Sequence, residues 1–129
     1  MAYRLLDWTL EVSTSTGTGD YVLGGAVPPW VTFASAGISD GDTILLTVFD
    51  STGKEEGLYT YNSGANSFTR TTIYRSTNGG AAVSWSAGTR YITCAMLGAV
   101  LESLLSPGQT GIPYRTADNA WSYAPAAGR

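Results

Sequence analysis

The sequence predicts a mainly β fold, namely a small antiparallel β-sandwich or barrel with one short C-terminal helix and an extended C-terminal arm. Short stretches rich in aromatic and β-branched residues recur at intervals of about 8 to 15 residues, and turn residues separate them. A helical spacing of apolar residues occurs only after residue 95. We therefore divide the 129 residues into a β-sandwich module over 1–95, a short amphipathic helix over 96–105 and an arm over 106–129 that we expect to be bound to a partner.

The clearest element is a β-hairpin within residues 54–80. Both of its arms are rich in aromatic residues and threonine, and the turn between them contains glycine and asparagine, which tolerate positive φ. Arg70 lies inside the second arm. We expect this side chain to point to solvent or to meet Glu55 or Glu56 across the hairpin, because a charge in a strand needs water or an opposite charge. The two arms and the turn are Gly57–Tyr61, Phe68–Tyr74 and Asn62–Asn66.

Alternation and turn residues place the remaining strands. In the first of them, Trp8, Leu10 and Val12 lie on one face, and the polar residues between them lie on the other. Residues 43–49 are apolar almost throughout, which predicts a central strand buried on both sides. Two adjacent prolines exclude helix and central-strand pairing over 26–30. The expected strands are 8–14, 21–23, a brief edge strand at 31–33, 43–49, a brief strand at 83–85, and 90–95.

The segment after Met96 changes to a helical period that ends at Pro107 and Gly108. A helix of about ten residues is marginal alone, so its leucine stripe must dock on its own sheet or on symmetry-related copies. The arm beyond it is either a partner-bound segment or a frayed terminus, and its aromatic residues favour the first, because disordered segments usually lack them. The candidate subunit interface is therefore Leu97, Val100, Leu101, Leu104, Leu105, Tyr114, Trp121 and Tyr123.

The composition argues against several classes of function. Charged residues make up 13% of the chain, about half the usual share, and the seven basic residues are scattered, so we expect no nucleic-acid partner. Such a weakly charged surface has few devices against association, and we expect other chains to cover much of it. The chain has no histidine, and Cys94 is its one cysteine, which excludes an intrachain disulfide and a multi-cysteine zinc site. We expect Cys94 to be a small buried apolar residue.

The remaining polar residues form no catalytic or metal-binding pattern. Glu55 and Glu56 are adjacent and must point to opposite faces of a strand, so we expect solvated charges and no acid/base pair. Asp40 and Asp42 indicate a turn, because a calcium loop needs further acidic ligands. We therefore expect no enzyme, no cofactor and no metal. Trp30 and Tyr61 are the candidates for stacking on a host glycan.

Apolar runs are too short for a signal peptide or a membrane helix. This predicts that the chain is made in the cytoplasm and does not insert into a membrane.

A set of short sequence pieces in a fixed order resembles a module of tail-fibre and minor tail proteins of tailed bacteriophages. The resemblance covers about Trp8 to Ala95. The pieces are Thr16-Gly17-Thr18-Gly19 with Leu23, Gly41-Asp42-Thr43, Glu56-Gly57 with Thr60-Tyr61, Phe68-x-Arg70-Thr71, Ser76 with Gly79, and Ser86-Ala87-Gly88-Thr89.

The resemblance implies a non-enzymatic virion protein that assembles with copies of itself, as a trimer by analogy with fibres, and with other virion proteins. Fibres usually continue into a long shaft, whereas this sequence ends soon after the module. A tail-associated short fibre, a fibre-anchoring adaptor and a capsid decoration or head-fibre protein all fit this pattern. A carbohydrate-binding module that recognises host glycans is the competing prediction.

Overall fold

The computed structural model describes residues 3–94, 113–117 and 120–123. Contacts divide the chain into two units, Met1–Ala95 and Met96–Arg129. In the second unit, β8 (Pro113–Ala117) and β9 (Ala120–Tyr123) pair as an antiparallel hairpin within the predicted arm. The predicted helix over 96–105 lies outside the described residues. The mainly β fold predicted from the sequence is confirmed.

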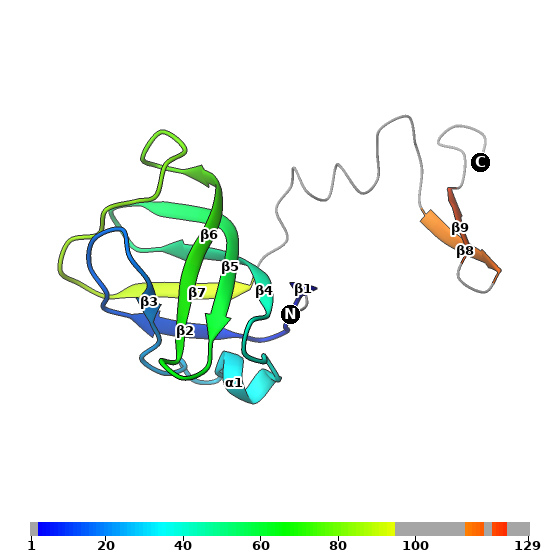
Figure 1. Ribbon diagram of the computed structural model, residues 1–129, viewed down its shortest axis with the longest axis horizontal. Helices are drawn as coiled ribbons and strands as arrows, with labels where there is room; N and C mark the ends of the chain where they lie inside the picture. Colours follow the sequence, from blue (N-terminus) through cyan, green and yellow to red (C-terminus); the bar gives the residue numbers. More distant parts are fainter. Residues whose placement is uncertain (1–2, 95–112, 118–119, 124–129) are drawn as a thin grey trace. The chain divides into compact units, whose positions relative to one another are not determined.

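One curled sheet forms the first unit (Figure 1). Its strand order is β2-β7-β4-β5-β6-β3, with β1 parallel to β4 and all other neighbours antiparallel. The segment after β3 returns to β2, because Val12 N donates to Gly25 O at 3.0 Å and Gly24 N donates to Val12 O at 2.7 Å. The sheet is therefore a nearly closed barrel. Its strands are β1 (Tyr3–Arg4), β2 (Leu10–Ser13), β3 (Tyr21–Val22), β4 (Thr43–Phe49), β5 (Lys54–Asn62), β6 (Ser67–Ser76) and β7 (Arg90–Cys94).

The predicted hairpin is present as β5 and β6, the two longest strands. Their pairing register shifts on either side of Gly57 and Leu58, where the strands approach closely. A Cβ atom on Gly57 would lie 2.0 Å from Thr72 O, so glycine is required at this bulge. The shift lets two long, twisted strands curve into the barrel wall.

Strand β4 occupies the middle of the sheet, but the prediction that it is buried on both sides is wrong. Ile44, Leu46 and Val48 point inward and are fully buried. Thr47 is half-buried and Phe49 is exposed on the outer side. A barrel has one interior, so an apolar strand in its wall still presents every second residue outward.

The predicted edge strand at 31–33 is also wrong, because helix α1 (Phe33–Ala36) begins there. Val31 keeps one isolated bridge to Thr9. Thr32 caps the helix by accepting a hydrogen bond from Ser35 N at 3.0 Å. Capping chemistry therefore overrides the β-branched pattern and delivers the Phe33 ring into the barrel core.

The apolar core fills the barrel interior between β3, β4, β5, β6 and α1. Its aromatic rings pack against one another, and those of Phe33 and Phe68 meet edge to face with centroids 5.0 Å apart. The buried apolar residues are Tyr21, Leu23, Phe33, Ile38, Ile44, Leu46, Val48, Tyr59, Tyr61, Phe68, Trp85 and Ile92.

Candidate functional site

A buried polar cluster occupies the barrel interior next to this core, and Glu55 is its centre. The expectation that Glu55 is solvated is wrong, because this residue is 0% exposed. Its carboxylate accepts hydrogen bonds from the hydroxyls of Tyr21 at 2.7 Å and Tyr59 at 2.8 Å, and from Val83 N at 2.9 Å. We call Glu55, Arg70, Tyr21, Tyr59 and Trp85 the Glu55 cluster.

Arg70 supplies the positive charge of the cluster. Its Nε lies 3.4 Å from Glu55 Oε2, which makes an ion pair without an aligned hydrogen bond. Its other nitrogens donate to Val83 O at 2.7 Å and Gly17 O at 3.2 Å, and its guanidinium lies 4.3 Å from the Tyr21 ring centroid. One side chain thus connects β6 to two loops that are far apart in the sequence. Arg70 was expected to point to solvent or to meet Glu55 or Glu56, and in the structure it meets Glu55.

The tyrosines of the cluster are held in their protonated form. Burial away from water, and then the negative charge of Glu55, raise the pKa of Tyr21 and of Tyr59 far above the usual range. Tyr21 also accepts a hydrogen bond from Trp85 Nε1 at 2.6 Å. The hydroxyls therefore act as fixed donors to Glu55. The cluster uses its polar groups on one another, so its geometry supports a structural role.

A second buried cation, Arg90, fixes the loop that precedes β7. Its guanidinium donates to the carbonyl oxygens of Ser15, Gly88 and Ser86, and it lies 5.0 Å from the Trp85 ring centroid. Its Nε is 3.5 Å from Asp50 Oδ2. Hydrogen bonds from the Thr52 hydroxyl, and from the Thr52 and Gly53 backbone, lower the pKa of Asp50, and the Arg90 charge adds to this effect.

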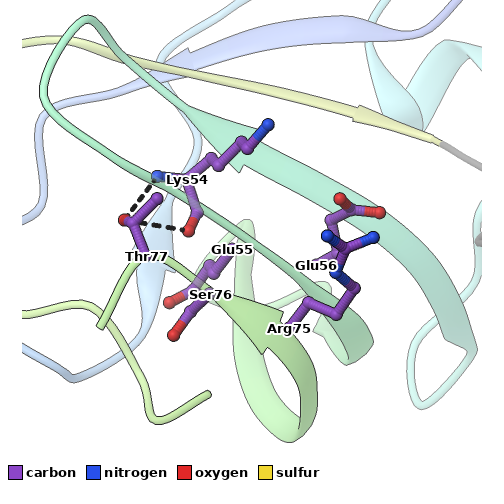
Figure 2. A pocket seen from close by; sticks show the side chains of 6 residues that line it. All are labelled: Lys54, Glu55, Glu56, Arg75, Ser76 and Thr77. Carbon is purple, nitrogen blue, oxygen red and sulfur yellow. Dashed lines mark hydrogen bonds between the residues drawn. The ribbon is translucent and has the colours of Figure 1, made fainter. Parts of the chain in front are cut away.

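Two shallow hollows lie near the turn between β4 and β5. In the smaller, of about 110 Å³, Thr77 Oγ1 accepts from Lys54 N at 3.1 Å and donates to Lys54 O at 3.4 Å (Figure 2). These bonds occupy the Thr77 hydroxyl and the backbone of Lys54. The smaller hollow is lined by Lys54, Glu55, Glu56, Arg75, Ser76 and Thr77, and the larger, of about 360 Å³, by Thr47, Phe49, Asp50, Ser51, Thr52, Gly53, Lys54 and Thr77.

Within residues 3–94, 113–117 and 120–123, no three His, Cys, Asp or Glu side chains gather as a metal site requires. No helix of these segments has the length and apolar character needed to cross a membrane.

The structure separates the two predicted glycan-stacking residues. Trp30 is 44% exposed, whereas Tyr61 is 4% exposed and its hydroxyl donates to Asn66 Oδ1 at 2.8 Å. Tyr61 belongs to the core and its ring is closed to a sugar. Trp8, which the sequence analysis assigned to a strand, is 77% exposed with a φ of 61°. Its exposure has no signal in the sequence, because alternation alone does not show where a strand begins.

The predicted subunit-interface residues fall in the second unit. Tyr114 lies on β8, and Trp121 and Tyr123 lie on β9, in register with Ser122, Arg115 and Pro113 respectively. The five predicted helix residues lie outside the described residues; they are Leu97, Val100, Leu101, Leu104 and Leu105.

Two sequence pieces of the phage-module resemblance meet in the barrel although they are distant in the chain, and a third is fixed by the neighbouring Arg90. Arg70 bonds Gly17 O, and Arg90 bonds the carbonyls of Ser86 and Gly88. These pieces therefore carry loop-fixing contacts. Comparison with protein families, with characterised proteins and with solved structures finds no match for this chain.

Proposed function

We propose that this protein is a structural component of a tailed-bacteriophage virion. In this role it is a short fibre or a fibre-anchoring subunit of the tail, it assembles with copies of itself and with other virion proteins, and it catalyses no reaction. The observation that carries the proposal is the ordered set of sequence pieces that resembles phage tail modules, two of which meet in the structure where Arg70 donates to Gly17 O. An ordered set of pieces is more specific than any one piece.

The internal pairing of the polar groups supports a structural role. The carboxylate of Glu55 accepts hydrogen bonds from two hydroxyls and one backbone N–H, and it forms an ion pair with the Arg70 guanidinium. A general base must be within hydrogen-bond reach of a substrate proton, and Glu55 is closed to solvent. Charge that an enzyme would direct into a cleft is used here to fix loops.

Labelling of particles tests the location. Virions of the phage that encodes this chain are purified, and gold-conjugated antibody against the chain is imaged by electron microscopy. We expect label on the tail. Label on the head supports a decoration or head-fibre protein instead, and absence of the chain from washed particles, measured by mass spectrometry, contradicts a virion role.

Glycan binding is the second candidate, because Trp30 offers an exposed ring beside the turn formed by the cis Pro28–Pro29 bond. Indole faces stack on pyranose rings. A glycan array with the full chain tests this candidate. Loss of binding for Trp30→Ala, with binding kept by Tyr74→Ala at the comparably exposed Tyr74, supports a glycan site at Trp30, and an array without signal excludes it.

A further inference from the structure

The outer face of the barrel carries an ordered apolar surface on the four neighbouring strands β2, β7, β4 and β5. Pairing registers align the outward side chains of these strands in rows across the sheet. We call this surface the outer wall. Its first row is Val12, Tyr91, Phe49 and Lys54, its second row is Leu10, Thr93, Thr47 and Glu56, and Leu45 and Leu58 pair beyond them.

Strand β2 of the outer wall reverses the usual distribution of polarity. On β2 the polar residues Glu11 and Ser13 are buried, whereas the apolar Leu10 and Val12 face outward and are half-buried. Glu11 is held inside because its carboxylate accepts from Phe33 N at 2.8 Å and Gly25 N at 3.2 Å. The strand therefore turns its apolar side toward the outside of the barrel.

The middle of the first row of the outer wall is an exposed aromatic pair. Phe49 and Tyr91 are 36% and 37% exposed, and their ring centroids lie 5.7 Å apart. Strand and residue spacings give the three rows a footprint of about 300 Å². The largest apolar patch on a monomer commonly has about this size and is often functional, and aromatic residues are enriched among those that dominate binding energy.

The first and second rows of the outer wall complement each other in size and charge. The first row has two large rings and ends at Lys54, whereas the second has Thr93 and Thr47 and ends at Glu56. The structure records no ion pair for Lys54 or Glu56 among the described residues. Glu56 is in register with Arg75 on β6, and Figure 2 shows the ends of these two side chains next to each other.

We propose that the outer wall is a contact between two copies of this chain, related by a two-fold axis that lies between the facing sheets and runs across the strands. This axis places the first row of one copy on the second row of the other. Lys54 then meets Glu56 of the partner subunit, and Phe49 and Tyr91 pack against the partner subunit's threonines. A two-fold contact is isologous, so one complementary pair of rows serves both copies.

This inference rests on self-association, which is part of the proposed function, and it differs in symmetry from the trimer implied by fibre analogy. A wall contact gives a dimer or an even multiple of it. A trimer fits the phage resemblance and contradicts the wall contact. A result that contradicts the wall contact therefore leaves the proposed virion role standing.

The first test measures the mass of the full-length chain by light scattering across a range of protein concentrations. We expect a dimer, and we expect Tyr91→Ser to weaken dimerisation by about tenfold or more, as loss of a central aromatic does. Tyr74→Ser on β6 is the matched control, because Tyr74 is 46% exposed and lies off the wall. A stable monomer, a trimer, or equal effects of the two substitutions would overturn the proposal.

A charge exchange tests the axis itself. Lys54→Glu and Glu56→Lys should each weaken the dimer, because each places like charges face to face across the contact. The double variant Lys54→Glu/Glu56→Lys should recover dimerisation, whereas an additive loss would refute this arrangement. Circular dichroism on each variant checks that the barrel is folded. Labelling of virions is unaffected by these outcomes, so it still decides the proposed function by itself.

Discussion

Replacement of Glu55 by glutamine tests whether the charge of Glu55 stabilises the fold more than a charge on the surface does. The substitution keeps the shape of the side chain and removes its negative charge. In the native protein Oε2 receives both tyrosine hydroxyls and lies 3.4 Å from Arg70 Nε, and Oε1 receives Val83 N. An amide has one acceptor oxygen, so these partners can no longer all be satisfied.

The introduced amide can place its oxygen at the Oε1 or the Oε2 position, and the expected loss in the free energy of unfolding follows from the more favourable of these two orientations. With its oxygen at the Oε2 position, the introduced glutamine would keep both hydroxyl donors, and its NH₂ group would face Val83 N–H. One unpaired buried donor costs about 1–3 kcal/mol. Arg70, with 6% of its side chain exposed, also loses its opposite charge. Breaking a buried pair by removing one partner costs about 3–5 kcal/mol in total, and we expect Glu55→Gln to fall in this range.

Urea unfolding followed by tryptophan fluorescence measures this cost. The protein is kept at low concentration, so that self-association does not enter the free energy of unfolding. Glu56→Gln is the matched control, because the neighbouring side chain points outward, and we expect it to change the free energy by about 0.5 kcal/mol or less. A cost for Glu55→Gln below about 1 kcal/mol, equal to that of an exposed pair, would refute the assignment of the cluster as a structural unit.

Three further predictions concern the bulge, the tyrosines and the β4–β5 turn. Gly57→Ala should lower the urea midpoint strongly, because its Cβ would lie 2.0 Å from Thr72 O, whereas Gly64→Ala, with open space around the new atom, should not. The raised pKa of Tyr59 means that its contribution to stability is present below pH 10 and is lost as the pH rises further, so absorbance near 295 nm should show its ionisation only together with alkaline unfolding. The lowered pKa of Asp50 gives the opposite sign, so Asp50→Asn should destabilise the protein at pH 7, and the difference from wild type should disappear as the pH falls below about 4.

The sequence predicts the strands of this barrel better than it predicts which side of each strand faces inward. Residues 54–80 are recognisable as a hairpin because alternating aromatic and threonine residues flank a turn that needs glycine and asparagine. Alternation on β2 is equally clear, yet its polar side is the buried one. That choice depends on Phe33 N and Gly25 N, the partners of Glu11, which lie on a loop that strand patterns do not place.

The polar interior could be inferred only in part from local sequence. Adjacent Glu55 and Glu56 must point to opposite faces, so one of them had to meet the interior of any closed sheet. The identity of its partners depends on Tyr21 and Val83, which are 34 and 28 residues away. Contacts over such separations arise from barrel closure, which is a property of the whole chain.

Burial of charge inside the barrel also bears on the proposed contact between copies. The chain has seven basic and ten acidic residues, and Glu11, Glu55, Arg70 and Arg90 are placed inside. The pair between Glu55 and Arg70 opposes a register slip of the β5–β6 hairpin, because a shift by one residue would turn one partner outward and leave the other buried alone. These four buried charges are therefore absent from the surface, where charged side chains help to keep copies of a protein apart. Lys54 and Glu56 are the charged residues of the outer wall, and in the proposed dimer they pair across the contact while the Phe49–Tyr91 pair packs against the second copy.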